Sequence, residues 1–286
     1  MASSARYTFK TDTFDYTNEI TKKSIFECAS LSKTVFTIIS LKLLTNKQLE
    51  ESIYNHLTED ELNCYGINAK FDKRYHDITL IMCLNHTSGL PNNKPLQRLK
   101  FKPGTDYNYS GNAFLLLQRI LEKKEGKPLT EIYTKMFPKL KNSQYIYLDK
   151  FNKNMTLPYD GDKTDKKFIR HIDRPVCLYS MYSNLEDYIK IIKDNTAILS
   201  RMKTPQLKIN KDISVGIGCL LYKNYLWQHG DNQYYKNFLF YDPDNNTGFI
   251  NLSNNIKGWG LISKEIPKPI IEFLHKNHNY DMKHFE

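Results

Sequence analysis

The sequence predicts an α+β fold in which an antiparallel β-sheet is flanked by helices and joined to a mainly helical region. Three observations lead to this prediction. β-forming residues lie near the N-terminus, a long middle segment shows helical periodicity, and the last third contains several short strand-like segments. Strands from the two ends then pair in one sheet around the helical segment. We expect a single domain over residues 1–286, with a sheet region at about 1–29 and 205–286 and a helical region at about 30–204.

The first elements follow from residue type and spacing. Tyr7–Phe26 mixes β-formers with polar residues and predicts one or two strands. Apolar side chains then recur every three or four positions and predict a buried helix over residues 31–44. A second apolar stripe predicts a helix over Asn112–Lys124 that stops at Gly126. Ser183–Glu186 has the spacing of a capping box, so we expect a further helix to start there.

The chain changes character after Pro205. Asp242–Gly248 is rich in turn residues and separates two strands. A last helix begins near Pro269, because proline is tolerated in a first helical turn. The predicted strands are residues 213–222, 225–229, 236–241 and 248–253.

The composition is that of an ordinary globular protein. Hydrophobic residues make up 40% and charged residues 25% of the chain, which excludes collagen-like, coiled-coil and wholly disordered proteins. The apolar run Thr34–Leu41 is far shorter than the ~18–20 residues that a membrane-spanning helix needs, so no transmembrane segment is predicted. Residues Met1 to Lys10 lack the apolar core of a secretion signal. We therefore expect a cytoplasmic protein, or one that has already been processed.

The formal net charge is +10, from 41 basic and 31 acidic residues. Such a balance favours anionic surfaces, but basic runs such as Asp165–Arg170 are short and no nucleic-acid motif accompanies them. We predict no specific nucleic-acid partner. The five cysteines are odd in number and widely spaced, with no Cys/His set suited to zinc. They indicate a reducing compartment, and the sequence predicts no metal and no organic cofactor.

The first candidates for chemistry are Ser30 and Lys33. On a helix, positions three apart share a face, which places the serine hydroxyl beside the lysine ammonium. A serine needs a base to become a nucleophile, and a partly desolvated lysine can serve as that base. A serine at a helix start also meets the positive end of the helix dipole, which favours an oxyanion. The same spacing fits a serine that caps the helix and a solvated lysine.

Two polar segments follow in the helical region. Ile78–Pro91 is an apolar stretch that ends in a polar turn, and its His86 suits a hydrogen-bonded structural role. Pro103–Gly111 leads from a Pro-Gly turn to the start of a helix, where side chains can face a cleft. Tyr109 in this loop can act as a tyrosinate where a cation lies beside it, or can simply pack.

The last candidate segment is Trp227–Asn232, on a predicted strand that can form one wall of a cleft. Because side chains alternate along a strand, only one of Gln228 and His229 faces that cleft. His229 would become cationic near its usual pKa of ~6.5 and attract a substrate carboxylate in mildly acid solution. Gln228 would bring no charge and favour neutral esters or amides.

Taken together, these segments resemble the serine β-lactamase and penicillin-binding-protein superfamily, particularly the branch of class C β-lactamases, DD-peptidases and related esterases. The resemblance spans roughly residues 15–265. It rests on Phe26–Lys33 (F-x-x-A-S-x-[ST]-K in the family), Met82–Pro91 (L-L-x-H-T-S-G-L-P), Pro103–Gly111 (P-G-x-x-[FY]-x-Y-S-[NG]), Tyr179–Tyr188 (a helix start) and Gly248–Asn254 (the closing strand).

Three features depart from the family pattern. Only 29 residues precede Ser30, where the family has a longer segment with two strands. Gly111 stands where many members have an asparagine that holds a substrate amide. The third motif, usually H-x-G or K-T-G, fits two alignments, and the one through His229 puts Asp231 where glycine is expected. The family's use of a cation at this place favours His229 over Gln228.

The resemblance implies a β-lactamase/transpeptidase-like domain with its active site between the sheet and the helical region. It implies that Ser30 attacks an ester or amide carbonyl while Lys33 and Tyr109 carry the proton. Backbone N–H groups of Ser30 and of Asp231 or Asn232 would hold the oxyanion, and the substrate-binding strand would comprise Gln228, His229, Gly230, Asp231 and Asn232.

The implied partner is a small-molecule or peptide-like ester or amide, and no oligomeric state is predicted. The walls that select the substrate fall around residues 92–100 and 150–175, where the family match is weakest. Two other functions remain open. One is a binding protein that kept the fold and lost turnover, and the other is a protein that associates with lipid or acidic polymer through its positive charge.

Overall fold

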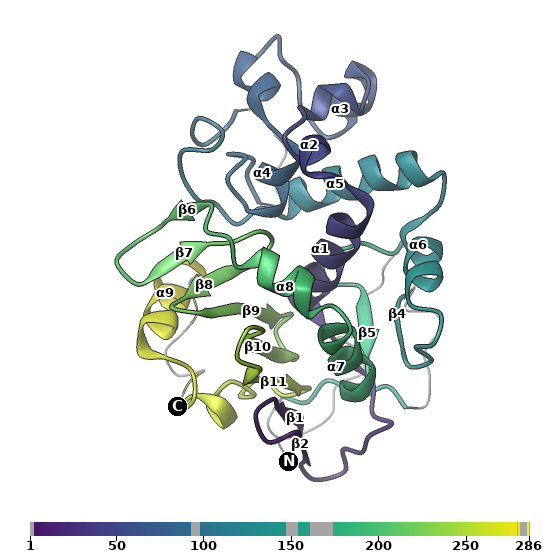
Figure 1. Cartoon of the computed structure of the whole chain (residues 1–286), viewed down its shortest axis with the longest axis vertical. Coiled ribbons are helices and arrows are strands. Elements are labelled where there is room, and N and C mark those ends of the chain that lie inside the picture. Colours follow the sequence, from purple (N-terminus) through teal and green to yellow (C-terminus); the bar gives the residue numbers. More distant parts are fainter. Residues whose placement is uncertain are drawn as a thin grey trace.

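The computed structural model describes residues 3–92, 98–146, 154–160, 174–278, 280 and 285. Within these residues the chain forms an eight-stranded antiparallel sheet, a second sheet of three short strands and a set of flanking helices (Figure 1). This arrangement confirms the predicted α+β class. The basic run Asp165–Arg170 lies outside the described residues, as do parts of the predicted substrate-binding walls.

The large sheet joins the two ends of the chain, as predicted. Its strand order is β2-β1-β11-β10-β9-β8-β7-β6, and β1 pairs with β11 so that Ser4 lies opposite Ser253. Two N-terminal strands are therefore present although only 29 residues precede Ser30. The strands are β1 (Ser4–Thr8), β2 (Thr13–Tyr16), β6 (Leu207–Lys208), β7 (Ile213–Val215), β8 (Leu220–Tyr222), β9 (Tyr225–Asp231), β10 (Lys236–Asp242) and β11 (Thr247–Ser253).

Helices cover both faces of this sheet, and strand alternation divides the core accordingly. On β10, Leu239 and Tyr241 join the larger hydrophobic cluster with α1, α5, α7 and α8. The intervening Phe238 and Phe240 face the other way and pack in a second cluster with α9. The helices are α1 (Ser32–Leu43), α2 (Asn46–Leu49), α3 (Glu59–Cys64), α4 (Leu80–Leu84), α5 (Gly111–Glu125), α6 (Leu129–Met136), α7 (Leu185–Lys193), α8 (Thr196–Met202) and α9 (Lys268–His278).

Helix α1 is the central element of the helical region, as its apolar pattern predicts. Every residue from Ser32 to Leu41 is buried. Figure 1 shows α1 passing between the sheet and the group formed by α2, α4 and α5, with α7 and α8 beside it. The predicted stop of α5 is also confirmed, because the helix is capped by Gly126 in the left-handed conformation.

Two local predictions were wrong. Residues 213–222 form two strands, because the segment folds back on itself as a β7–β8 hairpin whose turn is closed by the Gly216 N–H donating to the Cys219 carbonyl (3.0 Å). The capping box at Ser183 is absent, because that residue ends strand β5. Asn184 is the N-cap instead, and its side chain accepts from the Asp187 N–H.

A second, three-stranded sheet lies within the helical region and was not predicted. Its order is β3-β5-β4, with β3 at Phe26–Glu27, β5 at Met181–Ser183 and β4 at Ser143–Tyr145. Such two- and three-residue strands are too short to show a periodic pattern. The sheet matters for the site because β3 runs directly into the Ser30 turn.

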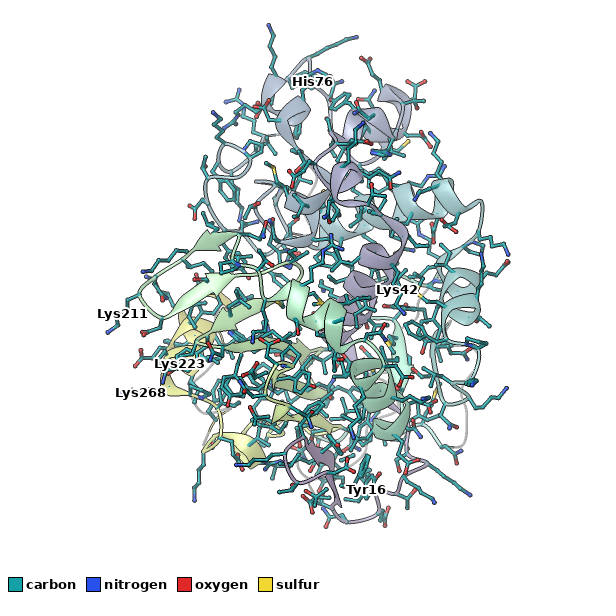
Figure 2. The ribbon with its side chains drawn as sticks, viewed as in Figure 1. Tyr16, Lys42, His76, Lys211, Lys223 and Lys268 are labelled. Carbon is teal, nitrogen blue, oxygen red and sulfur yellow. The ribbon has the colours of Figure 1, made fainter. Side chains whose placement is uncertain are left out.

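The positive charge lies mainly at the surface. Lys42, Lys211, Lys223 and Lys268 are exposed and project from separate elements (Figure 2). By contrast, Lys33 and Lys236 are buried, with 3% and 2% of their surface exposed. Among the described residues, no helix has the length and apolar character needed to cross a bilayer, and no group of His, Cys, Asp or Glu side chains is arranged to hold a metal ion.

Candidate active site

Ser30 lies in a single 3-10 turn, Ala29–Leu31, between strand β3 and helix α1. The turn is held to the small sheet, because the Cys28 N–H donates to the Met181 carbonyl over 2.8 Å. Ala29 adopts a φ of 47°, an uncommon conformation for a residue with a Cβ. Strain of this kind persists only where the surroundings over-determine the backbone, and it clusters at functional sites.

Two side chains meet at the Ser30 hydroxyl. The Lys33 Nζ donates to the Ser30 Oγ at 3.1 Å, and the Tyr109 hydroxyl donates to the same oxygen at 2.8 Å. A further hydrogen bond joins the Lys33 Nζ to the Leu178 carbonyl at 2.9 Å. The amine also lies 5.0 Å from the centre of the Tyr109 ring. The predicted group of Ser30, Lys33 and Tyr109 is therefore assembled in space.

The alternative in which Ser30 caps the helix and Lys33 is solvated does not hold. No side chain caps the 3-10 turn or α1, so Ser30 is not acting as an N-cap. Lys33 is buried, and its amine is bonded to two protein oxygens, so it is not a solvated lysine. The amine and the hydroxyl are thus within the hydrogen-bond reach over which a proton can be transferred.

His86 holds Tyr109 in place. The Ser110 N–H donates to the His86 Nδ1 at 3.1 Å, and the Asn108 N–H donates to the His86 carbonyl at 2.9 Å. The imidazole also packs on the Tyr109 ring, with centroids 4.5 Å apart. Burial, aided by the nearby Lys33, lowers the pKa of His86 well below its usual value, so the ring stays neutral. Its role here is structural, as the sequence indicated.

On strand β9, His229 is the residue that faces Tyr109. The two ring centroids lie 6.2 Å apart. Gln228 points to the other face of the strand and is buried, with its amide donating to the His229 carbonyl at 3.1 Å. Trp227 shares the face of His229, and their rings lie 6.1 Å apart. The register preferred from the family pattern is thus the one that the structure adopts.

The expectation that His229 becomes cationic in mild acid was wrong. The side chain is 2% exposed, and burial lowers its pKa well below 6.5. The charged or protonatable neighbours His278, Lys33 and Lys236 lower it further. The imidazole is therefore neutral in mild acid and offers hydrogen bonding without charge. The sequence does not show how strongly a residue on a strand is desolvated when layers pack on both sides of that strand.

Gly230 brings β9 against the Ser30 turn. A Cβ at this position would lie 2.7 Å from the Cys28 carbonyl oxygen, so only glycine allows this approach. The neighbouring strand reinforces it, because the Asn237 amide donates to the Glu27 carbonyl at 2.9 Å. The end of β9 is thereby placed beside the backbone of the nucleophile turn.

Asp231 and Asn232 use their side chains to close the β9–β10 hairpin. Asp231 is partly exposed, forms an ion pair with the buried Lys236 (2.7 Å) and accepts the Gln233 N–H. Asn232 accepts the Tyr235 N–H, and its own N–H donates to the Tyr235 carbonyl at 3.4 Å. Because N–H groups alternate in direction along an antiparallel ladder, the Asp231 N–H then points away from β10.

Two residues near this site were not predicted. Lys236 is buried beside the Trp259 ring, with its amine 4.8 Å from the ring centroid. His278, at the end of α9, packs on both Tyr109 and His229, with centroids 5.2 Å and 4.7 Å away. Neither residue belongs to a motif, and their distances in sequence from the other site residues do not indicate that they lie near the site. The final helix itself was predicted, but not where it ends.

Comparison with known proteins places the chain in a family. The family model described as Beta-lactamase matches residues 11–258. No match was found among curated proteins. Among solved structures, the chain is similar to the penicillin binding protein from Bacillus halodurans, with a TM-score of 0.69 and 16% identity over 88% of this chain and 90% of that one.

Two further structures are similar to the same extent. The Beta-Lactamase/D-Alanine Carboxypeptidase from Pseudomonas syringae has a TM-score of 0.69 and 14% identity over 98% of this chain and 93% of that one. The D-stereospecific amidohydrolase from Streptomyces sp. has a TM-score of 0.68 and 14% identity over 88% of each chain. At such identities the likeness shows the β-lactamase/transpeptidase-like fold, whereas membership follows from the family model. Because that model matches most of the chain, the protein belongs to the beta-lactamase family.

Proposed function

We propose that the protein is a serine hydrolase that transfers the acyl group of an ester or amide to Ser30 and then to water. One observation carries the proposal: the Ser30 Oγ lies within hydrogen-bond distance of both the Lys33 amine and the Tyr109 hydroxyl. A hydroxyl between two groups that can exchange a proton is the arrangement expected of an activated nucleophile. The match to a family with hydrolase neighbours supports the same reaction.

The first half of the reaction forms the acyl-enzyme. The Ser30 Oγ attacks the carbonyl carbon while its proton passes to the Lys33–Tyr109 pair, where a neutral amine or a phenolate accepts it. The C–O or C–N bond of the substrate then breaks, and the leaving oxygen or nitrogen takes that proton. Because one proton moves out and back through the same pair, Lys33 and Tyr109 act as a unit.

The second half releases the product. Water attacks the acyl carbon and gives a proton to the pair, and the Ser30 Oγ departs and recovers it. In both halves the carbonyl oxygen becomes an oxyanion. Its proposed donors are the N–H groups of Ser30 and Asp231, because the Asn232 N–H is directed to the Tyr235 carbonyl. No step requires a metal or an organic cofactor.

The test is covalent labelling of the full chain with a fluorophosphonate probe, followed by peptide mapping by mass spectrometry. We expect one adduct, on the peptide that contains Ser30, and none in Ser30→Ala. Ser24→Ala is the matched control, because Ser24 is a partly exposed serine on the loop before β3 and should leave labelling unchanged. Hydrolysis of a p-nitrophenyl ester should follow the same pattern.

The competing function is a binding protein that has lost turnover. It predicts that Ser30 is not labelled and that no p-nitrophenyl ester is hydrolysed above the rate of the Ser30→Ala variant. Labelling without release of product would mean that acylation survives and that deacylation has been lost.

A further inference from the structure

The C-terminal helix brings a second imidazole to the candidate active site. His278 is the last residue of α9 and lies edge-on to both Tyr109 and His229. Tyr280 packs beside it on His229, with ring centroids 5.5 Å apart. Its backbone carbonyl lies 2.7 Å from the His275 Nδ1, which ties the chain after α9 back to the helix. The position of His278 is therefore held by several independent contacts.

Two polar atoms without partners lie in the packed pair His278 and His229, and a third lies on Tyr107, which lines the same cavity as His278. The His278 Nε2, the His229 Nδ1 and the Tyr107 hydroxyl are all shielded from solvent, and none has a hydrogen-bond partner among the residues that the structure describes. Buried polar atoms in native proteins are nearly always satisfied, so three at residues that line this cavity or pack on its lining need a reason. A bound group that supplies the missing partners is such a reason.

A cavity of about 300 Å³ adjoins His278 and can admit such a group. Its lining is mostly polar and includes Lys100, Tyr107, Asn108, Tyr109, Asn277 and His278. The volume is at the lower end of the range for small-molecule sites. Tyr109 lines this cavity and also donates to the Ser30 Oγ, so the cavity borders a residue of the proposed reaction centre.

The proposed reaction decides which part of the substrate enters this cavity. The departing oxygen or nitrogen must take the proton held by Lys33 and Tyr109, so the leaving group lies on the Tyr109 side of the scissile bond. The acyl part remains attached to Ser30. This step rests on the proposed function.

We propose that His278 is a specificity residue that hydrogen-bonds a polar, uncharged leaving group, such as an alcohol bearing a second hydroxyl. The imidazole is suited to an uncharged partner, since burial and the nearby Lys33 lower its pKa to about 4 and keep it neutral. His229 beside it is neutral for the same reason. A site built to hydrogen-bond a hydroxyl discriminates strongly against an analogue that lacks one.

The experiment compares two esters of butyric acid that differ only in the leaving group. The 2-hydroxyethyl ester and the propyl ester have the same size, but only the first carries the second hydroxyl. We expect kcat/KM of the native protein to favour the 2-hydroxyethyl ester by about tenfold, the value of one hydrogen bond. His278→Phe should remove the preference, and His278→Gln should retain part of it.

The control is Lys276→Gln, an exposed position on the same turn of α9, which should leave the preference unchanged. Equal kcat/KM for the two esters in the native protein would overturn the proposal while leaving the serine hydrolase intact. An equal rise in kcat/KM for both esters in His278→Phe would also overturn the proposal, because it would show that the imidazole only obstructs the site.

A binding measurement separates this proposal from the proposed function. The measurement uses the Ser30→Ala protein, which cannot turn over. The imidazole NMR signal of His278 is identified as the one missing from the Ser30→Ala/His278→Gln double variant. N-(2-hydroxyethyl)acetamide should shift this signal. N-propylacetamide should shift it less. Equal shifts, or none, would refute the role of His278 whether or not the native protein is an enzyme.

Discussion

The Tyr109 hydroxyl donates a hydrogen bond to the Ser30 hydroxyl oxygen over 2.8 Å, across 79 positions of sequence. Neither residue belongs to a long regular element. Ser30 sits in a 3-10 turn, and Tyr109 sits in the loop before α5. His86 fixes the loop through the Ser110 N–H, and the small sheet fixes the turn through Cys28. The meeting of the two side chains therefore depends on supports that lie outside both segments.

Lys33 and Tyr109 are expected to act as one unit. Lys33→Met and Tyr109→Phe should each lower kcat/KM on a p-nitrophenyl ester by about 10²–10⁴, the usual range for general acid–base groups. The double variant should lose little more than the worse single variant, because both residues serve one proton transfer. Losses that multiply in the double variant would show separate roles. Circular dichroism of each variant checks that the fold is retained.

Gly230→Ala should impair the site more than it impairs the fold. The added Cβ would lie 2.7 Å from the Cys28 carbonyl, so β9 and the Ser30 turn must separate. We expect a loss of about 1–3 kcal/mol in the free energy of unfolding, as for other overpacked sites, and a large loss of fluorophosphonate labelling. Urea denaturation and labelling rates measure the two effects.

The control for this substitution is Gly126→Ala. Gly126 has a φ of 61° but no atom within 4 Å of an added Cβ. It should cost about 1 kcal/mol of stability because of its backbone conformation and leave labelling at the native rate. If Gly230→Ala labels as fast as Gly126→Ala, the close approach of β9 to the turn is not needed for the reaction.

The ion pair between Lys236 and Asp231 should be costly to break from one side. Lys236 is 2% exposed, and the Asp231 side chain is 12% exposed. Lys236→Met leaves a largely shielded carboxylate without its cation, so we expect a loss of up to about 3 kcal/mol in urea denaturation. Lys236→Met/Asp231→Asn should recover much of that loss. No recovery in the double variant would mean that the lysine acts mainly through its packing on Trp259.

His229 should make the protein less stable in acid. Its pKa is lowered in the folded state, so the unfolded chain binds a proton that the folded chain does not, and stability falls as pH drops below the unfolded pKa of ~6.5. Between pH 7 and pH 5 this effect amounts to about 2 kcal/mol for one such histidine. His229→Gln should reduce the pH dependence of the free energy of unfolding by that amount.

The control for the pH experiment is His76→Gln. This histidine is exposed at the end of the molecule remote from the sheet (Figure 2), so its removal should leave the pH dependence unchanged. An unchanged pH dependence in His229→Gln would mean that the imidazole is solvated or paired when folded.

The sequence alone predicted the long periodic elements and three residues that meet at the candidate site. Helix α1 runs from Ser32 to Leu43 against a predicted 31–44, because an apolar stripe at helical spacing has one way to be buried. The closing strands and the final helix followed from the same kind of pattern. Ser30, Lys33 and Tyr109 were identified from their motifs, and their functional roles remain predictions.

Tertiary structure decided what no local pattern encodes. Alternation along β9 placed His229 and Gln228 on opposite faces, but the packing of the strand against the Ser30 turn decided that His229 meets Tyr109. Residues 213–222 fold back as the β7–β8 hairpin, and the Ile217 N–H holds its turn to the end of α8. The neutral state of His229 and the arrival of His278 beside it depend on burial by α9. The periodicity of apolar residues shows which face of an element is buried. Contacts between segments distant in sequence decide which element packs on that face and how strongly a titratable group there is desolvated.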